Sequence, residues 1–441
     1  MSRPDSAGIE LRGAGDHHVV TVSDDVPLLV DHCFRRDYPR LVAMLTRRVG
    51  LQHIDVVEDA VQSALMAALT TWPSQSIPQD PSAWVYRTAY NRAVEELRRE
   101  MRRLKIAERD AVTHGEPATL PDEPVGPDEI RDDMLRMLFV CCDEAIPWES
   151  RLVLALKTLC GFSTSEIALR LFTSEANVYK RLARARERLR AGAIDVQTPP
   201  VEMLRSRLPG VHDVLYLLFN EGYLAAHPDH AIRKDLCDEA IRLTTLLGEH
   251  PVGAGPATFA LLALMHFHAA RLDARLDAVG GLVLLESQDR SLWDRGSIAC
   301  GAAWLARSAT GDEFTRFHAE AAIAAEHCFA PSFRDTRWEA IADLYAMLEH
   351  VAPSPLHTLN RALAVAELRG PAAGLAVLDG LVPPSWLTGS YLWNAVRSDL
   401  HRRAGHAALA RLHAESAVGS APTVAVQTAL RRRLLRERPG S

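Results

Sequence analysis

Residues 162–190 read FSTSEIALRLFTSEANVYKRLARARERLR, and the rest of the chain is interpreted outward from them. Ser163 and Glu166 form the Ser-x-x-Glu pattern of a capping box, which predicts the start of a short helix. Residues 172–174 then form a turn, and either Thr173 or Ser174 can cap a second helix. The pattern therefore predicts two short helices joined by a tight turn.

The second of these helices has one apolar face and one basic face. The apolar positions recur with the spacing of a buried helical stripe: Val178, Leu182, Ala185 and Leu189. The opposite face carries Lys180, Arg181, Arg184 and Arg188, with Arg186 to the side. Such a helix can pack on a scaffold while it lies in a DNA major groove. A basic run alone is more often a solvated amphipathic helix, but the capped helix and the short turn before it favour a DNA-binding helix-turn-helix.

Composition predicts a mostly helical protein that works in the cytoplasm. The 441 residues are 48% apolar and 6% aromatic, which allows about three domains with sizeable cores. The net charge of −6 says little about partners, because basic and acidic segments alternate. Seven cysteines without a C-x-x-C pair argue against a zinc site or a disulfide framework. We see no signal peptide and no apolar run as long as a membrane span, and we expect no metal and no cofactor.

The N-terminal half divides into two helical units and a linker. Residues 1–25 are expected to be a flexible tail, 26–106 a three-helix unit, 107–133 an acidic, proline-interrupted linker, and 134–196 the unit that contains the helix-turn-helix. In the first unit, the segment from Pro73 to Pro81 is expected to loop. The helix that follows starts with Trp84 and ends in arginines, so it suits unpaired bases and phosphates, although Trp84 itself is more simply a core residue.

This order of units resembles an extracytoplasmic-function (group IV) sigma factor of bacterial RNA polymerase. Residues 58–62, EDAVQ, are similar to the E-D-x-V-Q of the family, which implies that Asp59 and Gln62 face core polymerase. Residues 84–87, WVYR, are similar to the start of W-L-x-R-x-x-x-N beside the melted −10 strand. The resemblance makes four residues of this helix candidate −10 contacts: Trp84, Arg87, Asn91 and Arg98.

The resemblance also assigns the −35 contacts. Residues 178–186, VYKRLARAR, are similar to V-K-S-R-L-x-R-A-R, the −35 recognition helix of the family. This implies that four residues face base edges or nearby phosphate: Tyr179, Lys180, Ala183 and Arg184. Arg181 and Arg186 are expected nearer the DNA backbone. Tyr179 and Lys180 stand where Lys and Ser are commoner, which bears on the promoter sequence rather than on the class.

Residues 200–441 exceed what such a factor needs. The stretches FNEGY at 219–223 and QDRSLWD at 288–294 resemble a subgroup whose C-terminal extension carries tetratricopeptide-like helix pairs. We expect a helical extension at 200–300 and a tetratricopeptide-like domain at 301–441. Gly370 and Gly405 lie 35 residues apart, near the repeat period of about 34, and each is expected to turn the chain between two helices.

Polar residues of these motifs are candidate regulatory residues. We expect Asn220, Glu221, Asp289 and Arg290 to form buried, satisfied polar pairs that fix the packing of the extension. His266 and His268 lack a third metal ligand at a recognisable spacing, and a helix would turn them to different faces.

The sequence thus predicts an all-α protein that is not an enzyme. The resemblance implies that it binds core RNA polymerase and directs initiation at promoter DNA with −35 and −10 elements, with the extension regulating activity through a protein or peptide partner. Two alternatives stay open. One is a stand-alone helix-turn-helix regulator with a helical sensor domain. The other is an enzyme localised by its N-terminal part, with a pocket lined by Glu221, Asp289 and Arg290.

Overall fold

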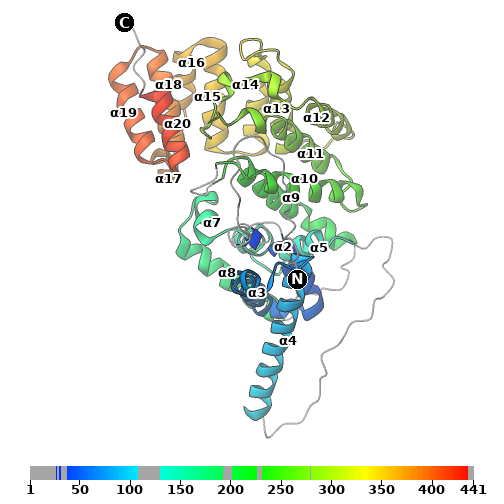
Figure 1. Ribbon diagram of the computed structural model, residues 1–441. Helices are drawn as coiled ribbons and strands as arrows, with labels where there is room; N and C mark the ends of the chain where they lie inside the picture. The colour runs from blue at the N-terminus through cyan, green and yellow to red at the C-terminus, as the bar shows by residue number, and fades with distance from the viewer. Residues whose placement is uncertain are drawn as a thin grey trace, which may run out of the picture.

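The computed structural model describes residues 26, 29–30, 37–107, 130–191, 201–225, 231–278 and 280–435. Over these residues all regular secondary structure is helical, apart from one isolated bridge between Leu276 and Leu282, so the all-α prediction is confirmed. The helices of the two N-terminal units lie at one end of the molecule and those of the extension are stacked at the other (Figure 1). The predicted tail and most of the predicted linker lie outside the described residues.

The first unit is built from three helices and a 3-10 turn: α2 (Tyr38–Val49), η1 (Leu51–His53), α3 (Ile54–Gln75) and α4 (Pro81–Ala107). They enclose a core of their own, which includes Trp72. The expected loop is shorter than predicted, because α3 continues through Pro73 to Gln75. A proline in the last turn removes only one helical hydrogen bond. The turn is held by the buried Trp72 and by the hydrogen bond from the Ser76 amide to the Trp72 carbonyl.

The second unit comprises α5 (Asp133–Cys141), α6 (Trp148–Thr158), α7 (Thr164–Arg170) and α8 (Glu175–Arg190). The predicted capping box is confirmed, since the Ser163 amide donates to Glu166 Oε2 at 2.6 Å and the Glu166 amide donates to Ser163 Oγ at 3.2 Å. Ser174 caps α8 through the Asn177 amide. The four apolar residues of the predicted stripe on α8 are all buried. Local sequence signals therefore determine the helix-turn-helix.

The first part of the extension shares a core with the second unit. It comprises α9 (Val201–Tyr223), α10 (Lys234–Glu249), α11 (Pro256–Ala269), α12 (Arg295–Ser308) and α13 (Arg316–Phe329), with the 3-10 turns η2 (Leu272–Ala274), η3 (Leu285–Ser287) and η4 (Arg290–Leu292) between α11 and α12. One apolar cluster runs from α5 through α13 and includes Leu51 and Ile54 of the first unit. A side chain at Gly222 would come within 2.7 Å of the Cys237 amide, so this glycine allows α9 to approach α10 closely.

The C-terminal part is a row of helical hairpins (Figure 1): α14 (Trp338–Val351), α15 (Pro355–Arg369), α16 (Pro371–Asp379), α17 (Ser385–Thr388), α18 (Tyr391–Arg403), α19 (Ala407–Gly419) and α20 (Val424–Leu434). Gly370 lies between α15 and α16 with φ 88°, and Gly405 between α18 and α19 with φ 81°. Both conformations favour glycine. The predicted turns between paired helices are therefore confirmed, while the tetratricopeptide-like name stays a prediction.

Candidate nucleic-acid and polymerase interface

The outward face of α8 presents a compact polar row. Tyr179, Lys180, Ala183 and Arg184 are all exposed, and Arg181 beside them is half-buried. Because these positions are one, four and five residues apart, their side chains share one helical face. Thr164 Oγ1 of α7 donates to Tyr179 Oη at 3.4 Å, which braces the tyrosine against the first helix of the motif. This face combines two cations, which suit phosphate and base-edge contacts, with an aromatic ring.

Arg186 lies differently from the other α8 candidates. Its guanidinium faces α3 of the first unit, with Nε 2.8 Å from Asp55 Oδ1 and Nη2 paired with Glu58. Arg190 pairs with Asp55 as well. Glu58 is only 5% exposed and accepts a further hydrogen bond from Thr158 Oγ1 at 2.7 Å. Burial raises the pKa of Glu58, and the Arg186 charge opposes that shift.

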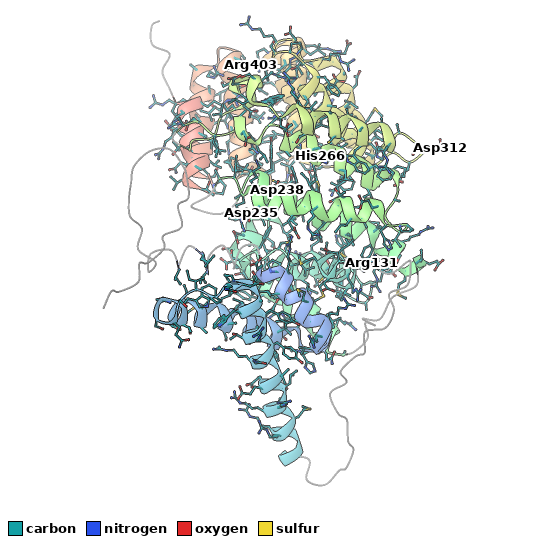
Figure 2. All side chains as sticks on the ribbon, turned by 45° about the vertical axis from the view of Figure 1, so that its right-hand side comes forward. Arg131, Asp235, Asp238, His266, Asp312 and Arg403 are labelled. Carbon is teal, nitrogen blue, oxygen red and sulfur yellow. The ribbon has the colours of Figure 1, made fainter. Side chains whose placement is uncertain are left out.

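The candidate −10 contacts occupy one side of α4. Arg87, Asn91 and Arg98 are exposed, and their spacing of four and seven residues places them on one helical face. Trp84 is half-buried, and its ring meets the Trp72 ring edge-on at 5.5 Å between centroids, so it packs against the core. The outer end of α4 projects away from the rest of the molecule (Figure 2). The arginine-rich part of α4 is therefore accessible along its length.

A neighbouring aromatic and cationic cluster was only partly evident in the sequence. The rings of Tyr86 and Tyr90 stack at 6.4 Å between centroids, and the Arg48 guanidinium lies 5.1 Å from the Tyr90 centroid. Arg48 Nη1 also donates to Tyr86 Oη at 3.4 Å. Arg48 comes from α2, so no spacing along α4 could have indicated it.

The candidate polymerase contacts Asp59 and Gln62 are both exposed on α3. Met66, one turn further on, is a large apolar side chain left exposed on the same helix. The three positions are separated by three and four residues and therefore share one face. Methionine suits an adaptable protein-protein contact, and the mixed face could bind another protein. The sequence reasoning missed Met66, although the same spacing would have found it.

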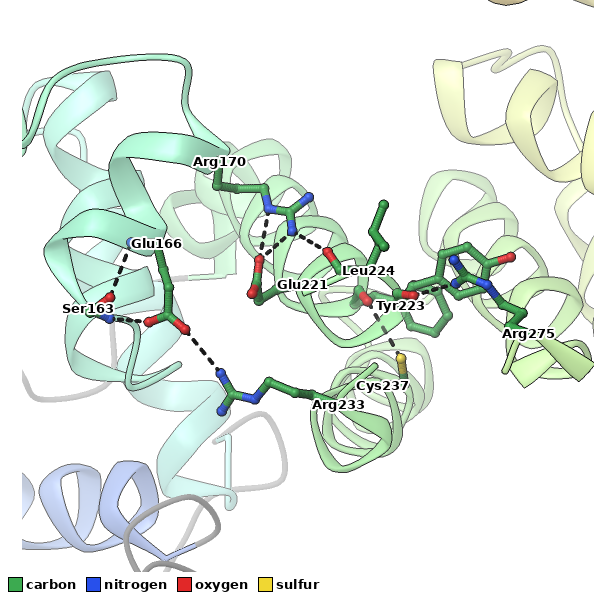
Figure 3. A network of polar contacts seen from close by, with 10 residues as sticks. Ser163, Glu166, Arg170, Glu221, Tyr223, Leu224, Arg233, Cys237 and Arg275 are labelled. Carbon is green, nitrogen blue, oxygen red and sulfur yellow. Dashed lines mark hydrogen bonds and ion pairs between the residues drawn. The ribbon is translucent and has the colours of Figure 1, made fainter. Parts of the chain in front are cut away.

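The extension contacts the helix-turn-helix through the motif FNEGY. Glu221 is fully buried and accepts from Arg170 of α7, whose Nε lies 3.1 Å from Glu221 Oε2 and whose Nη2 donates to the Leu224 carbonyl at 2.7 Å (Figure 3). Arg233 Nη1 of the extension lies 3.6 Å from Glu166, the residue that caps α7 (Figure 3). Glu221 therefore forms its ion pair with the helix-turn-helix. The prediction of a polar pair within the extension is wrong for this residue.

The other predicted regulatory residues do not join Glu221. Asn220 is half-buried beside Tyr216. Asp289 is exposed, contrary to the prediction, because it caps η4 at the surface by accepting from the Ser291 amide at 2.9 Å. Arg290 is half-buried and donates to two backbone carbonyls. Asp289 and Arg290 thus form contacts around η4, whereas Glu221 pairs with Arg170 of α7.

A second contact joins the extension to the turn of the motif. Phe172, which follows α7 with φ 49°, meets the ring of Trp386 in α17 at 4.8 Å between centroids. Further ion pairs join the first unit to its neighbours: Arg40 with Glu239, and Arg47 with Asp133. The two N-terminal units and the extension are therefore packed together.

Side chains that commonly bind metals are dispersed over the described part of the chain. No three or more His, Cys, Asp and Glu side chains gather there as a metal site would require. His266 lies in the extension, among the side chains of α11 (Figure 2). No described helix has the length and apolar character needed to cross a bilayer.

Comparisons with known proteins agree with this arrangement. Residues 33–103 match sigma-70 region 2, residues 136–189 match sigma-70 region 4, and residues 207–309 match a family of unknown function (DUF6596). An uncharacterized protein of Rhizobium meliloti (strain 1021) is 36% identical over 385 residues, which covers 87% of this chain and 90% of that protein. No solved structure matches.

The matches to sigma-70 regions 2 and 4, in this order along the chain, indicate a transcription initiation factor. The chain belongs to the sigma-70 family, and its domain content is that of an ECF-like sigma factor with a C-terminal extension. We refer below to residues 37–107 as region 2 and to residues 130–191 as region 4.

Proposed function

We propose that this protein binds core RNA polymerase in the cytoplasm and directs it to promoters that carry −35 and −10 elements. The observation that carries the proposal is the exposed row Tyr179, Lys180, Ala183 and Arg184 on a capped recognition helix. The exposed faces of α3 and α4 supply surfaces for polymerase and for the melted strand. Catalysis belongs to the polymerase, and this chain supplies positioning.

Run-off transcription with purified chain and core polymerase on a promoter library tests this proposal. We expect transcripts from a subset of promoters that share two sequence elements. Co-purification with core polymerase is the companion measurement, because a stand-alone regulator would bind DNA but would not bind core. Absence of both initiation and core binding would refute the proposal.

We infer further that the extension regulates the factor by holding region 4 against region 2. The −35 and −10 elements are about 25 base pairs apart, which is roughly 85 Å of B-DNA. Regions 2 and 4 touch through the pairs of Arg186 with Asp55 and Glu58, and cannot span that distance in this packing. The two regions must therefore separate on a promoter, and each contact from the extension opposes the separation. A protein or peptide that binds the helix pairs of the extension is the proposed trigger.

Point variants test this inference better than removal of the extension. The core that region 4 shares with α9–α13 would be exposed by a deletion, and region 4 would lose packing. We expect Trp386→Ala, which removes the ring on Phe172, to change transcription from a cognate promoter at an unchanged protein level. Leu412→Ala, which shortens an exposed apolar side chain of α19 away from region 4, is the control. Equal output from the two variants would reject the inference.

A further inference from the structure

Three arginines of the extension gather where its two sequence motifs meet. Arg271 and Arg275 flank η2 and are only 7% and 8% exposed, and Arg290 of η4 is half-buried. Among the described residues none of the three forms an ion pair with a carboxylate, whereas the buried Arg207 and the part-buried Arg170 and Arg233 do. A buried guanidinium without a counter-ion is costly, so this cluster requires a physical account.

Neutral groups hold the three guanidiniums in place. Arg271 and Arg290 both lie against the Trp293 ring, at 5.3 and 4.4 Å from its centroid. Arg271 Nε donates to Gln288 Oε1 at 3.2 Å. The Arg275 guanidinium lies 3.4 Å from the centroid of Tyr223, the last residue of FNEGY. Aromatic faces and amide oxygens orient the cations without neutralising them.

Several buried side-chain nitrogens at this place have no hydrogen-bond partner. They are Trp293 Nε1 and Arg290 Nη2, together with Nδ1 of His268 and of His327. Trp293 is only 3% exposed, and its indole nitrogen can only donate. Burial, reinforced by the charge of Arg271, lowers the pKa of His268 and of His327 to about 3. The free nitrogen of each neutral imidazole can donate or accept, whereas the guanidiniums and the indole only donate, so the site has an excess of positive charge and of donors.

We propose that this cluster, formed by Arg271, Arg275, Arg290, Trp293, His268 and His327, binds a small oxyanion. The ligand class is a metabolite that carries a carboxylate or a phosphate group. Such a group supplies acceptors and a counter-charge, and guanidinium forks match its geometry. Because the cations are recessed among aromatic rings, the site suits a small molecule rather than the backbone of a nucleic acid.

The position of the cluster connects it to region 4. Arg275 Nη1 donates to the carbonyl of Tyr223, and Arg170 of region 4 holds the carbonyl of the next residue, Leu224 (Figure 3). A ligand that draws Arg275 toward itself would act one residue from the contact between region 4 and the extension. The binding site itself does not depend on the proposed function, and its test needs no polymerase.

Titration calorimetry on the full chain tests the proposal, with sodium phosphate and sodium succinate as separate probes at constant ionic strength. We expect saturable binding of at least one probe, and the probe that binds identifies which anion the site prefers. Arg271→Gln should weaken that binding about tenfold or more. Arg307→Gln is the matched control, because Arg307 also stacks on two aromatic rings of the extension but lies outside the cluster.

Two results would overturn the proposal. One is the absence of saturable binding of either probe up to about 10 mM. This concentration is above the usual range of KM values for small-molecule substrates. The other is equal weakening in both arginine variants, which would indicate general charge attraction. Should Arg271→Gln fail to fold, the indole N–H resonance of Trp293 in the unmodified chain, assigned with Trp293→Phe, decides instead. It must shift on titration with the probe that binds, and an unmoved resonance refutes the site.

Discussion

Some charged residues of this protein are exposed and can contact a partner, whereas others form ion pairs inside the protein. Arg184 and Arg186 are two residues apart on α8, yet Arg184 is exposed and Arg186 is paired with Asp55 and Glu58. The motif resemblance assigned both to DNA. Helical periodicity could predict that Arg186 points to the side, but not that an acidic helix from far earlier in the chain would meet it there.

Arg184 provides the first prediction at this scale. If its guanidinium contacts a base, Arg184→Ala should cost about 1–3 kcal/mol of promoter binding at one promoter position. Competition binding with a set of single-base promoter variants measures this. A uniform loss across all sequences would assign Arg184 to phosphate instead. Arg411→Ala, which removes an exposed arginine of α19, should leave binding unchanged.

Glu221 provides the second residue-scale prediction. Glu221→Gln leaves the partly buried Arg170 without its counter-charge, so the free energy of unfolding should fall by about 1–3 kcal/mol. Urea unfolding followed by circular dichroism measures the change. The matched control is Glu415→Gln, whose exposed pair with Arg411 should contribute less than about 0.5 kcal/mol. The same loss in both variants would contradict the assigned role of Glu221.

Helices were predictable where their signals are local. The capping box at Ser163, the α8 stripe and the turns at Gly370 and Gly405 all depend on residues within one or two turns, and each was predicted correctly. Pro73 misled the prediction because the stability of that last turn comes from the buried Trp72. Contacts between distant elements, such as Arg170 with Glu221, leave no pattern in the sequence because each partner alone is an ordinary charged residue.

The docking of α8 on α3 yields a prediction about this pair of helices. Asp55→Asn combined with Glu58→Gln removes both acids that hold Arg186 and Arg190. The amide oxygen that Glu58→Gln introduces can still accept the hydrogen bond from Thr158, so this buried hydroxyl keeps a partner. We expect tighter DNA binding by the isolated chain and a steeper salt dependence, by up to about 1.8 in the logarithmic slope for two added phosphate contacts.

Fluorescence anisotropy at several salt concentrations measures both effects. Asp59→Asn is the matched control, because it removes an acidic charge from the outer face of the same helix. The double variant removes two charges and the control removes one, so if the control steepens the salt dependence by half as much or more, net charge alone is responsible and the internal pairs do not restrain α8.

At the scale of the whole molecule, the continuous core makes stability sensitive to acid. His212, His268 and His327 are embedded in or beside this core, and burial lowers the pKa of His212 to about 4 and of the other two to about 3. Their ordinary pKa is near 6.5, so between these values the unfolded chain binds protons that the folded chain does not. The contribution of these histidines to the free energy of unfolding should therefore have its full value above about pH 6.5. It should fall as the pH drops toward 4. The expected slope is at most about 1.4 kcal/mol per pH unit for each histidine.

Urea unfolding between about pH 4.5 and 7.5 tests this expectation. His212 hydrogen-bonds Thr258 Oγ1 at 2.8 Å and belongs to no proposed ligand site, so it can be changed separately. His212→Gln should flatten the slope by up to about 1.4 kcal/mol per pH unit, because glutamine binds no proton in this range. His350→Gln, at the exposed end of α14, is the control. A slope unchanged by His212→Gln would mean that other groups cause the acid sensitivity, and that this buried imidazole is already charged in the folded protein.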